Sequence, residues 1–263
     1  MRMMNSLSNL TETSPENEAD NSMFFVFDVE TIPDFEFIRN VMNDTDSDDD
    51  AILVAASEKL ANNKSGFLPP MYHRIISWVG LWIENNGRPL QKVSWSGNDE
   101  KTGLEELFNA LLTYKDFGLI HHNGRGFDLP LITYRAMKHN MQMPLRLNHY
   151  DIRYRFSKSN VDLMDEFSNY GASSYPKLKH LGHLINIPFK QTGEGNEVLE
   201  MFRNDELDKI ETYCHEDVMA TYIVWLKMKY TTGDLPDDLY ENLNKRAVNK
   251  LKEIQSEKTT DSL

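Results

Sequence analysis

Blocks of apolar residues alternate with polar stretches along the chain, and their lengths and spacings predict short strands and helices. The first block, MFFVFDVET at 23–31, is rich in aromatic and β-branched residues and ends in polar ones, and Pro33 closes it. It therefore predicts a buried strand. Two more strands are predicted over 72–82 and 89–95, and the turn residues ENNGR between them indicate a hairpin. The three strands are expected to form a meander.

Helical spacing begins with GLEELFNALLTY, whose apolar residues fall at 104, 107, 108, 111 and 112. That spacing is typical of an amphipathic helix. FGLIHHN predicts the next strand, a helix is expected to begin near Asp128, and a last strand is expected near HYDI at 149–152. The other predicted helices cover 51–61, 161–169, 177–185, 196–203, 205–230 and 237–256. The resulting order, βββαβαβ followed by helices, predicts an α/β fold with a central mixed five-stranded sheet flanked by helices and a C-terminal helical segment.

The length of 263 residues and the 40% hydrophobic content allow one sizeable core, so one main domain is expected. We place it at 23–230. Residues 1–22 are polar and acidic and predict a flexible tail, and 231–263 predict a C-terminal helix with a polar end. The acidic run NDTDSDDD at 43–50 is expected to be a solvated insert.

The location of the protein is inferred from two features of the composition. No apolar run reaches the roughly 18 residues that would cross a bilayer, and the N-terminus has no apolar signal-peptide block, so no membrane association is expected. The single cysteine, Cys214, excludes an intrachain disulfide and a cysteine-rich zinc site. A reducing compartment, and therefore a cytoplasmic location, is predicted.

The net charge of −13 is unevenly distributed along the chain. The first 50 residues carry 13 acidic and two basic side chains, whereas the remaining residues carry 28 acidic and 26 basic ones. The main body is therefore nearly neutral. Ten basic and five acidic residues lie between 125 and 190, a local excess that could contact a phosphate backbone. An ordinary solvated surface is the alternative.

Two acids stand at the end of the first predicted strand. Asp28 and Glu30 are two residues apart, and because strand side chains alternate between faces, both carboxylates project the same way. They repel each other unless a cation lies between them, and Mg²⁺ and Mn²⁺ prefer carboxylate oxygens. The pattern indicates metal ligands, and the alternative is two solvated acids at a strand end.

Three further side chains complete the candidate chemistry. Asp128 follows the glycines of NGRGFD and begins a predicted helix, where an N-cap role is the alternative. Tyr213 and Asp217 are four apart in a predicted helix, so they share one face. His215 lies on another face and is expected at the surface. Four carboxylates suit two divalent ions of the kind that hydrolyse phosphodiesters, with the phenol orienting water.

In their order and spacing, FDVET, NGRGFD and YCHED resemble the three motifs of the DEDD exonuclease superfamily, in its tyrosine-bearing branch. The sequence is most similar to predicted exonucleases related to the proofreading domain of family B DNA polymerases, over roughly 23–230. YRFSKSNVDLMDEFSNYGA and LKHLGHLINIPFK also resemble that group. The resemblance implies a ribonuclease H-like fold, two Mg²⁺ or Mn²⁺ ions, 3′ to 5′ exonuclease activity, nucleic-acid binding and a role in DNA repair.

The resemblance also implies individual roles. Asp28, Glu30 and Asp217 would hold the first metal ion. Asp28 would share the second, which Asp128 would support directly or through water. Tyr213 would orient the attacking water.

Substrate contacts are implied for three more residues. Thr31 and Asn123 would contact the terminal nucleotide, and Phe127 either joins them or belongs to the core. Asp162, in VDLMDEF, competes for a place in the site, and an acid at a helix N-terminus is its alternative role.

The acidic composition predicts a weakly bound single-stranded 3′ end rather than a tightly held duplex, because neutralised phosphates supply most non-specific affinity. DNA is favoured over RNA, and nucleoside 5′-monophosphates are the expected products. An exoribonuclease of the same superfamily is one alternative. The other is a non-catalytic module whose acidic N-terminal region binds a protein partner.

Overall fold

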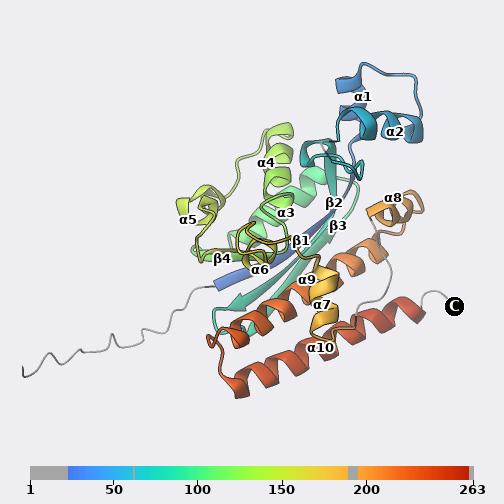
Figure 1. The fold of residues 1–263 in the computed structure, drawn as a ribbon. Coiled ribbons are helices and arrows are strands. Elements are labelled where there is room, and N and C mark those ends of the chain that lie inside the picture. Colours follow the sequence, from blue (N-terminus) through green and yellow to red (C-terminus); the bar gives the residue numbers. More distant parts are fainter. Residues whose placement is uncertain (1–22, 62, 189–194, 261–263) are drawn as a thin grey trace, which may run out of the picture.

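A five-stranded sheet forms the centre of the protein, and helices cover both of its faces (Figure 1). The computed structural model describes residues 23–61, 63–188 and 195–260. In spatial order the strands are β3 (Pro89–Ser96), β2 (His73–Glu84), β1 (Met23–Pro33), β4 (Phe117–His121) and β5 (Asn160–Asp162). β1 and β3 pair antiparallel with β2, whereas β1 and β5 pair parallel with β4. The predicted mixed five-stranded sheet is confirmed.

The central strand β1 is buried on both sides because its apolar residues serve two separate cores. Phe24 and Val26 pack against the helices of one face, whereas Phe25, Phe27 and Val29 pack against those of the other. This alternation places Asp28 and Glu30 on the same side as Phe24 and Val26. The register of the strand therefore decides which helices face the acids.

Two groups of helices cover the sheet (Figure 1). The face of Phe25 is covered by α3 (Glu100–Leu111) and α4 (Asp128–Lys138). The face of Phe24 is covered by α7 (Leu178–Leu184) and the long α9 (Leu207–Thr231), and α10 (Asp237–Thr260) packs on α9. None of the described helices is long and apolar enough to cross a membrane.

Shorter elements surround the sheet. They are α1 (Phe35–Met42), α2 (Asp49–Lys59), η1 (Pro70–Tyr72), η2 (Leu145–Asn148), α5 (Tyr150–Arg153), α6 (Leu163–Phe167) and α8 (Gly195–Arg203). The helix α1 was not expected from the sequence, although Asp34 caps it by accepting a hydrogen bond from the main-chain N–H of Phe37 at 3.1 Å.

The predicted strand near HYDI is wrong, because Tyr150–Arg153 forms the helix α5. The fifth strand is instead Asn160–Asp162, which the periodicity placed at the start of a helix over 161–169. Three residues are too few to show a period, and this strand forms only because β4 offers a parallel partner. The helix that follows, α6, begins at Leu163.

The acidic insert is a loop for only part of its predicted length. The helix α2 begins at Asp49, and Asp48 caps it by accepting a hydrogen bond from the main-chain N–H of Ala51 at 2.8 Å. Acids in a first turn favour a helix because they interact with the unpaired N–H groups and the dipole there. The predicted tail at 1–22 lies outside the described residues.

Candidate active site

The predicted metal ligands meet where β1 and α9 face each other. Asp28 points toward α9, and the thiol of Cys214 donates to the main-chain oxygen of Asp28 at 3.3 Å. Burial raises the pKa of the Asp28 carboxyl well above its usual value, and the charges of Glu30, Asp128 and Asp217 raise it further. The structure thus brings the four carboxylates named from the sequence into one cluster.

Asp128 joins this cluster from the N-terminal end of α4. Phe127 occupies the cap position and Asp128 is the first helical residue, so the N-cap alternative for Asp128 is wrong. Burial raises the pKa of Asp128 to about 7, and the charge of Asp162 raises it as well. Hydrogen bonds from the main-chain N–H groups of Asp128 itself and of Val29 oppose that rise. The bond from Val29 ties the start of α4 directly to β1, between Asp28 and Glu30.

Tyr213 and Asp217 approach the same cluster from α9, as their four-residue spacing predicts. Burial is the main reason that the pKa of the Tyr213 phenol is raised, and the charges of Asp217, Glu30 and Asp28 add to it. The phenol therefore stays protonated at neutral pH. His215 is part-buried beside Lys92 and Glu211, where burial lowers its pKa to about 4.

Cys214 is a member of the site that the sequence analysis missed. Its sulfur lies with carboxylate oxygens of Asp28 and Glu30 in a group whose ligand atoms are all within 4.8 Å of one another. Burial and the neighbouring acids raise the pKa of the thiol, so it is neutral, and a neutral thiol is a poor ligand for a hard cation. The sequence did hold a signal for this placement. Cys214 precedes Asp217 by three residues, and residues three apart are neighbours on the surface of a helix.

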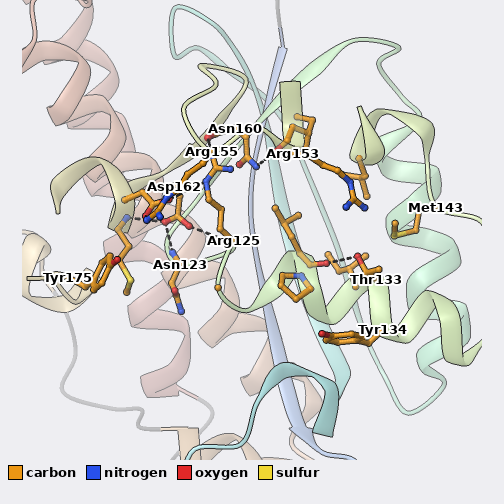
Figure 2. Close-up of a pocket in the computed structure, with 18 residues that line it drawn as sticks. Asn123, Arg125, Thr133, Tyr134, Met143, Arg153, Arg155, Asn160, Asp162 and Tyr175 are labelled. Atoms are coloured by element: carbon orange, nitrogen blue, oxygen red, sulfur yellow. Dashed lines mark hydrogen bonds and ion pairs between the residues drawn. The ribbon is translucent and has the colours of Figure 1, made fainter. Parts of the chain in front are cut away.

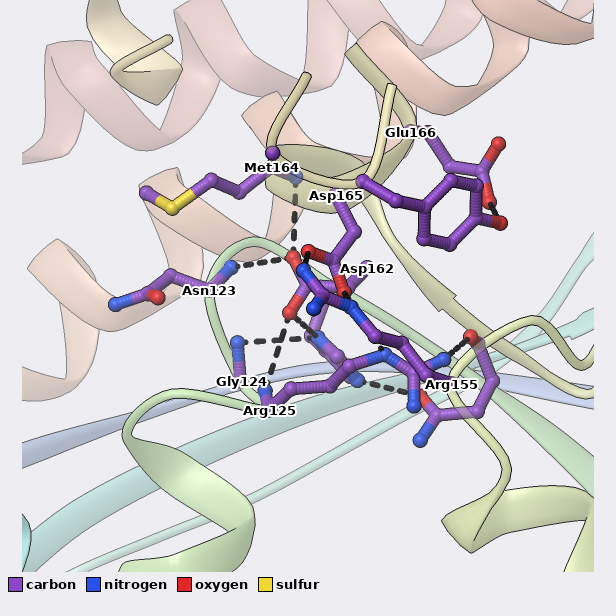
Figure 3. Close-up of polar contacts among 12 residues, drawn as sticks. Asn123, Gly124, Arg125, Arg155, Asp162, Met164, Asp165 and Glu166 are labelled. Carbon is purple, nitrogen blue, oxygen red and sulfur yellow. Dashed lines mark hydrogen bonds and ion pairs between the residues drawn. The ribbon is translucent and has the colours of Figure 1, made fainter. Parts of the chain in front are cut away.

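The turn that leads into Asp128 is held by a buried carboxylate, that of Asp162 (Figure 3). It accepts hydrogen bonds from the main-chain N–H groups of Asn123 at 2.8 Å, Arg125 at 3.1 Å and Met164 at 3.0 Å. The bond from Met164 makes Asp162 the cap of α6, as its alternative role predicted. Because its oxygens are already engaged by main-chain donors, Asp162 fixes the turn.

His121 supports the same turn from inside the sheet. Its Nδ1 accepts from the main-chain N–H of Gly124 at 3.1 Å, so the proton lies on Nε2, which donates to Asn160 at 2.6 Å. Burial lowers the pKa of His121, so its 3.5 Å contact with Asp162 joins a neutral ring to a carboxylate. A Cβ at Gly124 would lie 2.6 Å from this ring, and this position therefore requires glycine.

The three residues expected to contact the terminal nucleotide lie around the site. Thr31 and Phe127 meet at His73, which the sequence did not indicate. The Thr31 hydroxyl is 3.1 Å from His73 Nδ1, and the ring centroids of Phe127 and His73 are 5.2 Å apart. His73 Nε2 donates to the carbonyl of Leu68 at 3.2 Å, so Nδ1 accepts from Thr31. Asn123 adopts a left-handed backbone conformation, with φ of 65°, at the mouth of a separate cavity.

That cavity, of about 730 Å³, borders the turn that leads to Asp128 (Figure 2). Its lining includes Asn123 and Gly126 of the turn, Tyr134 of α4 and Arg153 of α5. Among the described residues, none of the four clustered carboxylates lines it. The acidic cluster and this cavity are therefore distinct features that adjoin the same turn.

Comparison with known structures shows the same fold in a larger enzyme. The family B DNA polymerase from Pyrobaculum calidifontis matches with a TM-score of 0.52 and 12% identity, over 80% of this chain and 24% of that one. A product-bound exonuclease I matches with a TM-score of 0.46 and 13% identity, and the match covers 84% of this chain and 46% of that one. A metal-free complex of E. coli ExoI with ssDNA matches with a TM-score of 0.44 and 14% identity, and the match covers 84% of this chain and 41% of that one. The chain thus spans less than half of each of these proteins.

No curated protein matches the sequence. A family described as predicted 3′-5′ exonuclease related to the exonuclease domain of PolB matches residues 65–262, about three quarters of the chain. NGRGFD and YCHED fall inside the match, whereas β1 with its two acids precedes it. Because the match is this extensive and the fold agrees with it, the chain belongs to this family of PolB-related 3′-5′ exonucleases.

Proposed function

We propose that Asp28, Glu30, Asp128 and Asp217 bind two divalent metal ions, and that the site removes nucleotides from the 3′ end of single-stranded DNA. One observation carries the proposal: three other carboxylates raise the pKa of the enclosed Asp28 carboxyl. Such a cluster is costly without a compensating cation, and divalent ions supply that compensation.

The chemistry of the donor set fits Mg²⁺ or Mn²⁺. Oxygens of Asp28 and Glu30 lie together on one face of β1, and hard cations prefer such oxygens to the neutral Cys214 thiol beside them. Bound ions would lower the pKa of a coordinated water and neutralise charge on the phosphate, with nucleoside 5′-monophosphates as products.

The protein side chains orient the reactants. Tyr213 keeps its proton, because burial and the neighbouring acids raise its pKa, and its hydroxyl can therefore hydrogen-bond the attacking water. Thr31, Asn123 and Phe127 would contact the terminal nucleotide. The nearly neutral body of the chain favours a single strand over a tightly held duplex.

Hydrolysis of a 5′-labelled 20-nucleotide DNA strand tests the proposal. With Mg²⁺ or Mn²⁺ we expect a ladder that shortens from the 3′ end, and with EDTA no products. A 3′-labelled copy should release labelled mononucleotide at once. Absence of products with either ion, or an unchanged ladder in EDTA, contradicts the proposal.

The same assay on an RNA strand of equal sequence decides between the two substrates. Faster hydrolysis of RNA would replace the single-stranded DNA assignment with that of an exoribonuclease. The metal requirement and the role of the four acids would be unaffected by that result.

A further inference from the structure

Four aromatic rings follow one another on the surface beyond the turn that leads to Asp128. Tyr150, Tyr154, Phe156 and Tyr170 form this aromatic row, with successive ring centroids 5.2, 5.7 and 4.7 Å apart. Tyr150, Tyr154 and Phe156 keep 69%, 44% and 57% of their surface exposed. Contiguous exposed aromatic surface is unusual on a protein unless it binds a partner.

Arginines are interleaved with the row. Arg153 is exposed and makes no ion pair with any acid in the described part of the chain. Arg155 and Arg125 share one carboxylate, that of Asp165, at 2.6 and 3.4 Å. The acids beside these three arginines are Asp165 and Asp162, whose charge also acts on Arg125, so the group keeps one positive charge in excess. The surface therefore offers exposed rings beside a small excess of positive charge.

The cavity of about 730 Å³ lies between the turn that leads to Asp128 and the arginines beside the row (Figure 2). Asn123 and Gly126 of the turn line it, and so do Arg153, Arg155 and Tyr175. A strand whose 3′ end lies at the four acids could follow this cavity past the turn to the row. Three arginines and two aspartates line this cavity, whereas the first 50 residues of the chain carry 13 acids and two bases.

We propose that the aromatic row, with Arg153 and Arg155, binds the single strand upstream of its 3′ end. Unpaired bases would stack on the exposed rings and phosphates would contact the arginines, the combination used by proteins that hold single strands without sequence preference. Paired bases of a duplex hide the faces that such rings need. The proposal rests on the proposed function only in placing the 3′ end at the four acids.

Fluorescence anisotropy with 5′-fluorescein-labelled dT15 in EDTA measures this contact without hydrolysis. Tyr154→Ala should weaken binding about tenfold, because stacking on one ring contributes about that factor. Arg153→Gln should weaken binding and reduce the slope of log affinity against log salt by about 0.7, the value for one phosphate contact on a single strand. Binding to a blunt dA15·dT15 duplex should not respond to Tyr154→Ala.

Two matched control substitutions lie on the helices α9 and α10. Tyr230→Ala removes one ring of another stacked pair, that of Tyr230 and Tyr240 at 4.3 Å, which lies about 20 Å along α9 from Asp217. Arg246→Gln removes an exposed arginine of α10. Neither should change the affinity for dT15. The proposal is overturned if Tyr154→Ala and Arg153→Gln both bind dT15 as tightly as the wild type. It is also overturned if the control variants lose as much affinity for dT15 as these two.

Hydrolysis of the dinucleotide dTpdT separates this inference from the proposed function. The dinucleotide has no nucleotides upstream of those at the acids, so on this proposal Tyr154→Ala and Arg153→Gln should cleave it at the wild-type rate. A matching loss on dTpdT would assign the two residues to the catalytic site and contradict the row. If the wild-type protein cleaves nothing with either ion, the proposed function fails, while the dT15 measurement still decides whether the row binds single strands.

Discussion

At the scale of single residues, the acids of the site are buried close to one another, and this burial raises their pKa values. Asp28 and Asp128 have raised pKa values because burial and nearby acids penalise their charged forms. Burial, with the charges of Asp217, Glu30 and Asp28, keeps the Tyr213 phenol protonated. A bound cation would favour the charged forms of the two acids. Three predictions follow from the placement of individual side chains.

Replacing Asp28 with asparagine should abolish hydrolysis while the fold remains intact. The carboxyl is the proposed shared ligand of both ions, and losing it should cost several kcal/mol of transition-state stabilisation. The measurement is the nuclease rate together with a circular dichroism melt. A variant that folds and keeps more than about a tenth of the wild-type rate would show that Asp28 is not a shared ligand.

The same substitution should stabilise the metal-free protein, and more at pH 8 than at pH 5. Burial and the neighbouring acids raise the folded pKa of Asp28 above its unfolded value of 3.8. Such a carboxyl contributes stability that is fully present below its unfolded pKa and is lost as the pH rises towards its folded pKa. Asparagine has no carboxyl to ionise, so the variant avoids that loss, by on the order of 1–3 kcal/mol. Comparing melts of the variant and the wild type at each pH cancels the histidine contributions. An equal gain at both pH values would contradict the electrostatic account.

Tyr213→Phe should lower the single-turnover cleavage rate about 10- to 1,000-fold at saturating Mn²⁺. It deletes the hydroxyl and keeps the ring, so affinity for metal and substrate should hardly change. Tyr230→Phe, farther along α9, is the matched control. An unchanged rate for Tyr213→Phe would leave the tyrosine as a packing residue only, in which case Tyr213→Ala should act through stability.

At the scale of elements, the turn between β4 and α4 positions Asp128, and it is held from the neighbouring strand. Asp162 is the last residue of β5, and its carboxylate accepts hydrogen bonds from the main-chain N–H groups of Asn123 and Arg125 (Figure 3). A three-residue strand with little packing of its own thus fixes the turn through one buried carboxylate. Residues that fix the orientation of a metal ligand commonly affect metal affinity as strongly as a weak ligand does.

Asp162→Asn should therefore raise the Mn²⁺ concentration needed for half-maximal dTpdT hydrolysis about 10- to 100-fold. Asparagine has nearly the same shape as aspartate. Its amide nitrogen is a donor, however, and it would face one of the main-chain N–H groups that now donate a hydrogen bond to the carboxylate. Asp165→Asn, an acid of the same helix end that pairs with arginines, is the control and should leave the metal requirement unchanged. If the Mn²⁺ requirement of Asp162→Asn equals that of the wild type, the turn does not depend on this carboxylate.

At the scale of the whole molecule, the sheet separates two cores and brings distant segments to one edge. The acids come from β1, the start of α4 and the middle of α9, which are far apart in sequence. The excess negative charge is concentrated in the first 50 residues, which include Asp28 and Glu30 but carry most of their acids in 1–22 and 34–50. Its effect on nucleic acid is therefore expected to be a long-range repulsion that salt screens.

A variant lacking residues 1–22 should bind dT15 as well as or better than the full chain at low salt. The deletion removes four acidic residues and one basic one, changing the net charge from −13 to −10. The difference in affinity should close as salt is raised to 0.5 M, and the dTpdT rate should stay the same. A large loss of dTpdT hydrolysis would show that these residues take part in the reaction.

The sequence by itself determined the class of fold, the order of most elements and the family. Long strands such as β1 and amphipathic helices such as α3 carry a hydrophobic period that local sequence expresses, and the motif spacing supported the family assignment that the comparisons confirm. The acids could be named in advance because the faces of a strand and of a helix follow from spacing alone.

Only the tertiary structure decided the rest. β5 exists because β4 gives it a partner, whereas HYDI forms a short helix next to β5, where the carbonyl of Ile152 accepts a hydrogen bond from the side chain of Asn160. The positions of Cys214 and His73, the fastening of the turn by Asp162 and the aromatic row all depend on contacts between segments distant in sequence. Such contacts leave no local period in the chain, because they are selected by packing across the sheet rather than along it.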